Sequence, residues 1–172
     1  MLSRLPPSAP LIRVQNWVQG ASAPEPVTRL LELDWPRRAG EVCAGGDVDV
    51  ICIGPTDWLV VSAADVDADR LLPALEGAFQ GSSFRATDFS SALVRIRIDG
   101  AHGRALLSKA CALDVYSEHL APGRAPRTLI AGLPVVIRSL DSAVFECIAP
   151  LSYADYLLAW LTDAAAEYIA TD

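Results

Sequence analysis

Paired apolar runs joined by short turns constrain the fold of this sequence most strongly. Residues 50–53 and 59–61 are rich in β-branched side chains, and Gly54-Pro55-Thr56-Asp57 between them has the composition of a turn. Residues 128–130 and 133–137 meet in the same way around Ala131-Gly132. The two patterns predict β-hairpins, the first over residues 48–62, and therefore an antiparallel sheet.

Three further segments are predicted to be strands. Residues 92–98 alternate, so that one face is apolar and the other carries Arg95 and Arg97. The core-facing positions are Val94, Ile96 and Ile98. An apolar run covers residues 144–148, and residues 28–35 alternate leucines with charged side chains.

Three helices are predicted from apolar residues at helical spacing. The first stripe covers residues 71–79, with Asp65 or Asp67 before it as the cap. A second stripe covers residues 106–113, and a third follows Ser152, a capping residue. This order of elements predicts an α+β fold with ferredoxin-like antiparallel sheet layers and helices. A parallel doubly wound sheet is disfavoured, because helices do not follow every strand.

The domain organisation is predicted from the distribution of prolines. Residues 1–26 contain five prolines together with Gly20 and Ser22, a composition that favours an extended N-terminal arm over packed structure. Residues 27–172 are predicted to form a single α+β domain.

Composition excludes several classes of partner. The net charge is −7, and no cluster of basic residues is interleaved with aromatic ones, so nucleic acid is excluded as a partner. No apolar run approaches the roughly 20 residues that a membrane span needs. Prolines at positions 6, 7 and 10 interrupt any secretion signal, so we expect a cytoplasmic protein. Since 52% of residues are hydrophobic and 20% charged, some apolar surface is expected at a subunit interface.

Residues that carry chemistry are sparse, and no catalytic, cofactor-binding or metal-binding residue is predicted. Asp88 and Ser90 fit a base and a hydroxyl, but the same spacing is a common turn device, which we favour. His102 and His119 are the only histidines, too few for a zinc site. The cysteines are widely spaced and are predicted to be buried free thiols rather than a metal or redox site; they are Cys43, Cys52, Cys111 and Cys147.

Candidate binding residues are arginines and aromatic residues. One hypothesis is an arginine pocket for a carboxylate or a folate tail, formed by Arg95, Arg97, Arg104, Arg124 and Arg127, with a solvated strand face or salt contacts to a partner as alternatives. Trp35, Trp58 and Trp160 are expected mostly in the core. The residues predicted to contact a partner are Trp17, Arg95, Arg97, Tyr153 and Tyr156.

Four motifs in order carry a family resemblance. Residues 87–100 resemble the Asp-x-Ser, strand, Gly opening of glycine-cleavage T-protein-like domains, and Ala112-Leu113-Asp114-Val115 resembles the end of the helix that follows. Residues 53–59 (Ile-Gly-Pro-Thr-Asp-Trp-Leu) and 150–156 (Pro-Leu-Ser-Tyr-Ala-Asp-Tyr) are similar to sarcosine oxidase gamma subunits. Together the motifs span about residues 28–162.

The resemblance implies a fold like the folate-binding domain of T-protein and a non-catalytic gamma subunit of a heterotetrameric flavoenzyme with alpha, beta and delta subunits. Such an enzyme converts sarcosine to glycine, with formaldehyde or methylene-tetrahydrofolate and hydrogen peroxide as further products. FAD, FMN, NAD and tetrahydrofolate are expected in the partner subunits, and no cofactor in this chain.

Two other functions stay open at this point. A free-standing folate-binding or aminomethyl-transfer domain would need a ligand pocket within this chain. A small-molecule-sensing ferredoxin-like module would form a homodimer without flavoproteins.

Overall fold

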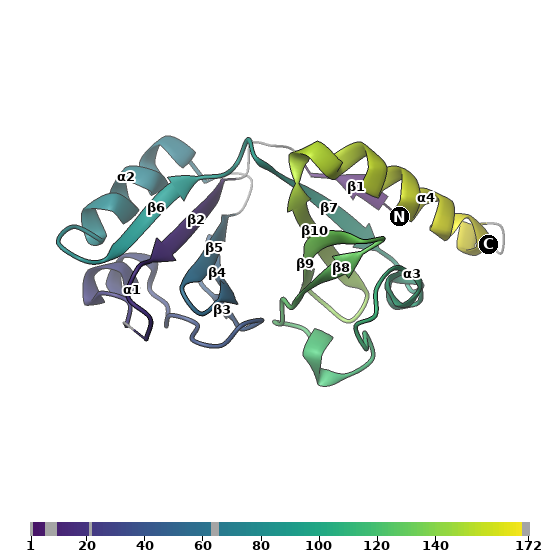
Figure 1. The fold of residues 1–172 in the computed structure, drawn as a ribbon, viewed down its shortest axis with the longest axis horizontal. Helices are drawn as coiled ribbons and strands as arrows, with labels where there is room; N and C mark the ends of the chain where they lie inside the picture. The colour runs from purple at the N-terminus through teal and green to yellow at the C-terminus, as the bar shows by residue number, and fades with distance from the viewer. Residues whose placement is uncertain (1, 6–9, 21, 63–65, 170–172) are drawn as a thin grey trace. The chain divides into compact units, whose positions relative to one another are not determined.

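The chain divides into two compact units, seen in a computed structural model that describes residues 2–5, 10–20, 22–62 and 66–169. Unit 1 contains Met1–Leu5 and Ala92–Asp172, and unit 2 contains Pro6–Ser91 (Figure 1). Each unit has its own five-stranded sheet and its own hydrophobic cluster. The single domain predicted for residues 27–172 is therefore two units, because each sheet closes a core with its own helices.

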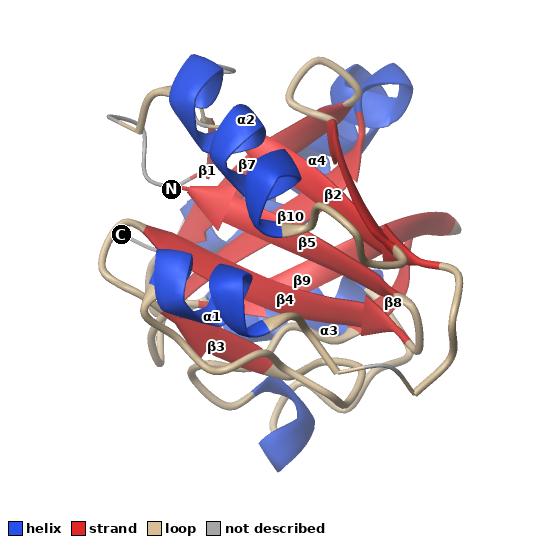
Figure 2. Ribbon diagram, turned by 90° about the vertical axis from the view of Figure 1, so that its left-hand side faces the viewer, coloured by secondary structure: helices blue, strands red, loops and turns tan. Residues whose placement is uncertain are grey.

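Unit 2 is built on an antiparallel sheet with the strand order β3-β4-β5-β2-β6. Its strands are β2 (Leu11–Asn16), β3 (Val42–Ala44), β4 (Val48–Gly54), β5 (Asp57–Ser62) and β6 (Phe84–Asp88). The helices α1 (Glu25–Leu31) and α2 (Ala68–Ala78) lie on one face of this sheet (Figure 2). β4 and β5 confirm the hairpin predicted for residues 48–62.

An aromatic cluster fills the core of unit 2. The rings of Phe79 and Phe84 stack at 5.4 Å between centroids, and Trp58 and Trp35 pack against them. The indole N–H of Trp58 donates to the carbonyl oxygen of Pro36 at 2.9 Å, which satisfies its one polar atom inside the core. The prediction that Trp58 is buried is confirmed.

Two predictions for the first 35 residues are wrong. Leu11–Asn16 is not an extended arm but β2, which pairs with β5 on one side and β6 on the other. Its alternating apolar residues are buried, and the prolines around it hid this pattern. Of the predicted strand at 28–35, residues 28–31 belong to the helix α1 (Glu25–Leu31) and residues 32–35 form no strand. Proline is accepted in a first helical turn, and Glu32 takes a left-handed conformation (φ 52°) that ends the helix.

The start of α2 agrees with one of the two predicted caps. The carboxylate of Asp67 accepts a hydrogen bond from the backbone N–H of Asp69 at 3.0 Å. Asp65, the alternative cap, lies outside the described residues.

Unit 1 is built on an antiparallel sheet with the order β1-β7-β10-β9-β8. Its strands are β1 (Leu2–Arg4), β7 (Leu93–Asp99), β8 (Arg127–Ile130), β9 (Leu133–Ser139) and β10 (Val144–Pro150). The helices are α3 (Gly103–Ala110), α4 (Ala154–Ile169) and the short 3-10 turns η1 (Glu118–Leu120) and η2 (Leu151–Tyr153). Ser152 lies inside η2, so the prediction that it caps the last helix is wrong.

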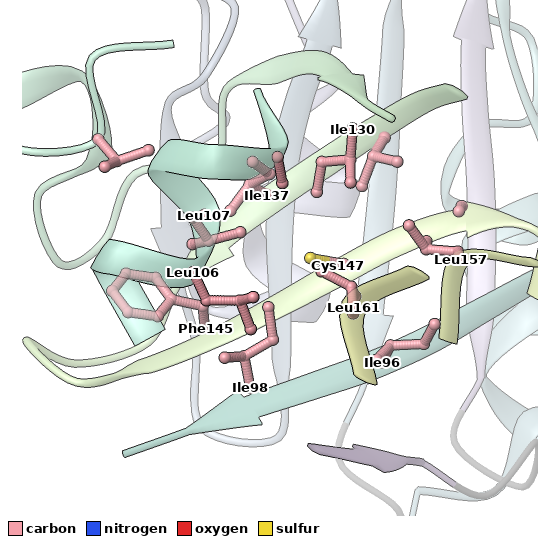
Figure 3. Packing of buried hydrophobic residues seen from close by; sticks show 14 of the residues in the cluster. Ile96, Ile98, Leu106, Leu107, Ile130, Ile137, Phe145, Cys147, Leu157 and Leu161 are labelled. Atoms are coloured by element: carbon pink, nitrogen blue, oxygen red, sulfur yellow. The ribbon is translucent and has the colours of Figure 1, made fainter. Parts of the chain in front are cut away.

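Both long helices of unit 1 cover the same sheet face. Leu106 and Leu107 of α3 and Leu157 and Leu161 of α4 join one cluster with the buried side chains of the sheet (Figure 3). That cluster includes Val94, Ile96 and Ile98, so the predicted core face of residues 92–98 is confirmed. The α+β class with antiparallel sheets is confirmed for both units. Among the described helices, none is long and apolar enough to cross a membrane.

Candidate partner-binding surface

Trp17 is an exposed tryptophan held on a rigid turn of unit 2. The side chain of Asn16, at the end of β2, donates to the carbonyl oxygen of Val18 at 2.7 Å and accepts from the Val18 N–H at 3.0 Å. Ser83 donates its hydroxyl to the same Asn16 oxygen at 2.6 Å. Asn16 itself is buried, so these bonds fix the backbone on both sides of Trp17.

The turn presents apolar surface to solvent. Trp17 is 67% exposed and Val18 is 53% exposed. The chain that follows, at Gly20 and Ser22, lines a hollow of about 500 Å³ together with Trp35 and other residues of unit 2. An exposed tryptophan on a fixed backbone loses little conformational entropy when a partner covers it, which favours a binding role.

A second exposed aromatic group lies at the start of α4 in unit 1. Tyr153 is 40% exposed and Tyr156 is 55% exposed, while Leu157 points to the core. Trp160, four residues after Tyr156, is half-buried and packs against the core cluster, as expected for it. Tyr153, the last residue of η2, and Tyr156, in the first turn of α4, are thus both exposed, as their predicted partner contact requires.

The two arginines of the predicted interface have partners within unit 1. Arg95 donates from Nε to Glu146 at 2.5 Å, and Arg138 lies 3.4 Å from the other carboxylate oxygen. Glu146 is fully buried, so this ion pair is part of the internal structure. Burial lowers the pKa of the Arg138 guanidinium, and the Glu146 charge acts in the opposite direction. Arg97 is ion-paired with Asp99 at 3.3 Å and remains partly exposed.

Arg104, a member of the predicted arginine pocket, has a structural role. Its guanidinium donates to the carbonyl oxygens of Val115, Leu120 and Ser142, and it lies over the Phe145 ring. These bonds fasten the segment after α3 to the sheet. A guanidinium with this set of partners is not presented as a free carboxylate receptor.

The predicted turn at Asp88 and Ser90 is confirmed. The Asp88 carboxylate accepts from both the N–H and the hydroxyl of Ser90, and the Ser90 oxygen accepts from the N–H of Leu11 at 3.0 Å. The two side chains therefore connect the end of β6 to β2. These hydrogen bonds engage the Ser90 hydroxyl and a carboxylate oxygen of Asp88, the groups that would otherwise serve as nucleophile and base.

The two histidines lie in different segments of unit 1. His102 stacks on Tyr168 next to α3, whereas His119 lies in η1. Within the described ranges, no group of three or more His, Cys, Asp or Glu side chains is arranged to hold a metal. Cys52 and Cys147 are buried, and burial raises the pKa of both thiols, which keeps them protonated near neutral pH.

Sequence reasoning missed two features of these surfaces. The bracing of Trp17 by Asn16 depends on Ser83, which is 67 residues away. The buried Glu146 had a local signal, a single carboxylate inside the apolar strand β10 opposite the arginines of β7.

The fold places the chain in a recognisable class. The structure of glycine cleavage system aminomethyltransferase T from Bartonella henselae matches with a TM-score of 0.69 and 16% identity, covering 93% of this chain and 44% of that one. Heterotetrameric sarcosine oxidase from Corynebacterium sp. U-96, solved with pyrrole 2-carboxylate, contains a chain that matches with a TM-score of 0.86 and 22% identity, covering 98% of this chain and 84% of that one. The molecule is therefore an α+β protein with the aminomethyltransferase-like fold.

Sequence comparison narrows this class to one family. A sequence model of the sarcosine oxidase gamma subunit family matches residues 19–167. The sarcosine oxidase gamma subunit of Corynebacterium sp. (strain U-96) is 26% identical over 140 residues, which is 80% of this chain and 66%, just under two thirds, of that relative. The chain belongs to the sarcosine oxidase gamma subunit family.

Proposed function

We propose that this chain is the non-catalytic gamma subunit of a heterotetrameric sarcosine oxidase, in which it packs against alpha, beta and delta subunits. The family match over residues 19–167 is the observation that carries the proposal. The similar chain in the Corynebacterium structure comes from a protein described as heterotetrameric, which supports an assembly of this kind.

The proposed assembly is cytoplasmic and oxidises sarcosine. Sarcosine, oxygen and water would yield glycine, formaldehyde and hydrogen peroxide. When tetrahydrofolate accepts the carbon, methylene-tetrahydrofolate would form in place of formaldehyde and no water would be consumed overall. FAD, FMN, NAD and tetrahydrofolate would be held by the partner subunits, and no residue of this chain is assigned to them. The structural roles of Asp88, Ser90 and Arg104 support a chain that does not carry the chemistry.

The proposed contacts are the exposed aromatic residues. Trp17 in unit 2 and Tyr153 and Tyr156 in unit 1 offer large apolar surfaces of the kind that dominate binding energy at interfaces. Arg97 is proposed as a charged contact at the rim, because it is partly exposed. Arg95 is proposed to act through its ion pair with Glu146, which shapes the strand rather than reaching a partner.

The test is purification of the tagged chain from its own host, followed by native mass spectrometry and a visible absorption spectrum. The proposal expects a yellow complex with larger chains that oxidises sarcosine, while the purified chain alone is colourless and inactive. A colourless monomer or homodimer from the host would contradict it. Binding of tetrahydrofolate and of amino acids to the lone chain would then be measured, since a free-standing folate-binding domain would bind tetrahydrofolate.

A further inference from the structure

Unit 1 contains a pocket that the proposed subunit role does not use. Its volume is about 560 Å³, within the range of roughly 300–1,000 Å³ that is common for small-molecule sites. Four elements supply the apolar wall: Leu2 from β1, Ile98 from β7, Leu106 from α3 and Ala165 from α4. The pocket therefore lies between the sheet and both helices of one unit and does not depend on unit 2.

Two glycines, Gly100 and Gly103, shape the pocket wall where β7 leads into α3. Gly100 takes a φ of 135°, a conformation that favours glycine, at the turn between β7 and α3. A Cβ on Gly103 would lie 3.1 Å from two ring atoms of Phe145 and 3.4 Å from Ile98. Helix α3 therefore begins in close contact with the sheet.

Stacked and ion-paired side chains connect α3 with α4, and two of these residues, His102 and Tyr168, line the pocket. The rings of His102 and Tyr168 lie parallel, with 4.8 Å between centroids and 9° between planes. The Lys109 ammonium lies 4.8 Å from the Tyr168 ring centroid and 2.5 Å from a carboxylate oxygen of Glu167. These contacts connect α3 to α4, the two helices that contribute to the pocket wall.

The polar groups of the pocket define what it accepts. The described lining includes Asp99 but no lysine or arginine, so an anionic ligand would find no such cationic partner there. His102 lines the pocket and its ring stacks on Tyr168, and the imidazole nitrogens are groups that can donate a hydrogen bond to a ligand or accept one from it. The apolar wall requires that the rest of the ligand be hydrophobic.

We propose that this pocket binds a small, uncharged, mainly apolar molecule whose single hydrogen-bonding group pairs with the His102 imidazole. All the described lining residues belong to unit 1, so ligand binding can be tested separately from the proposed function.

Two related fluorescent probes test the proposal on the full chain. N-phenylnaphthylamine is neutral and apolar with one N–H, and anilinonaphthalene sulfonate is the same framework with an added anionic group. We expect saturable binding of about one N-phenylnaphthylamine per chain, with at least tenfold weaker binding of the sulfonate because the described lining offers it no lysine or arginine.

Matched variants locate the probe. Ala165→Phe fills the pocket and is expected to weaken N-phenylnaphthylamine binding at least tenfold, whereas Ala166→Phe places the same ring on the exposed neighbouring position and should leave binding unchanged. His102→Ala is expected to weaken binding severalfold, and the amide signals of Gly100 and Gly103 should shift on titration of the unaltered chain.

Several results would overturn the proposal. These are the absence of saturable binding, equal loss in the two phenylalanine variants, or tighter binding of the sulfonate than of the neutral probe. Binding to the lone chain that disappears in the purified assembly would also overturn it, because the pocket would then be a subunit contact.

Discussion

Replacing Trp17 with alanine is expected to weaken subunit assembly without unfolding the chain. The side chain is 67% exposed, and a tryptophan buries up to about 250 Å² when fully covered, so a partner would cover about 170 Å². At about 25 cal/mol per Å², this area corresponds to about 4 kcal/mol as an upper limit. Because area converts incompletely into affinity, the expected loss is about 2–4 kcal/mol, or roughly 30-fold to 1,000-fold in Kd.

Tyr116 provides the matched control. It is also 67% exposed, but it lies in the loop after α3 and is not among the proposed contacts. Each alanine variant would be titrated against the remaining subunits by surface plasmon resonance, and its urea midpoint would be measured on the isolated chain. Trp17→Ala should raise Kd while the urea midpoint stays unchanged, and Tyr116→Ala should change neither quantity.

An unchanged Kd for Trp17→Ala would refute this reasoning. Equal weakening by both variants would show a general loss of exposed aromatic surface rather than a specific contact. A lowered urea midpoint for Trp17→Ala would mean that the exposed ring stabilises unit 2 itself, and that the binding estimate includes a folding effect.

Three further predictions concern stability. Gly103→Ala should destabilise unit 1 by about 1–2 kcal/mol in urea unfolding, because its Cβ would press on the Phe145 ring; an unchanged midpoint would contradict this. Glu146→Gln should cost about 3–5 kcal/mol, since it leaves two guanidinium groups without their buried carboxylate, and a loss below 1 kcal/mol would show that other contacts compensate. Burial raises the pKa of Cys147, so the thiol stays protonated in the folded chain while the unfolded chain releases its proton above about pH 8.5. The contribution of Cys147 to the free energy of unfolding is therefore complete below about pH 8.5 and falls by about 1.4 kcal/mol per pH unit well above it. Cys147→Ala in reducing buffer should make the pH dependence of that free energy shallower by the same amount. An identical slope in the variant would refute the raised pKa of Cys147.

Local patterns were sufficient to predict much of the fold. The hairpin at residues 48–62 and the alternation of residues 92–98 are periodic over their whole length, so burial of one face follows directly. Residues 28–31 belong to α1 although the pattern predicts a strand, because the alternation of Leu31 and Leu33 with Glu32 and Asp34 is too short to separate a strand period from a helix period. Strand β2 was hidden among prolines, and its place between β5 and β6 depends on pairings distant in sequence.

For the candidate binding residues too, local features could be predicted from the sequence, whereas contacts between distant segments could not. Trp17 and Tyr156 are exposed, in agreement with the prediction from residue type and position. Arg95 instead pairs with Glu146, which is 51 residues away in the sequence. The unit 1 pocket requires four separate elements to meet, and no local pattern indicates that. The missing information in each case was which distant segments lie side by side.

The pairing of β1 with β7 has a consequence for synthesis of the chain. Ser3 lies opposite Arg97, so the first strand of unit 1 is made before the whole of unit 2 and its partner strand afterwards. At roughly 5–20 residues per second, the ribosome needs about 5–20 seconds to deliver that partner. Unit 2 is continuous in sequence and can fold during this interval, whereas unit 1 must close a long loop of chain before its sheet is complete. The nascent chain thus exposes an unpaired β1 for seconds, and a slow translation step between residues 6 and 97 would lengthen that exposure.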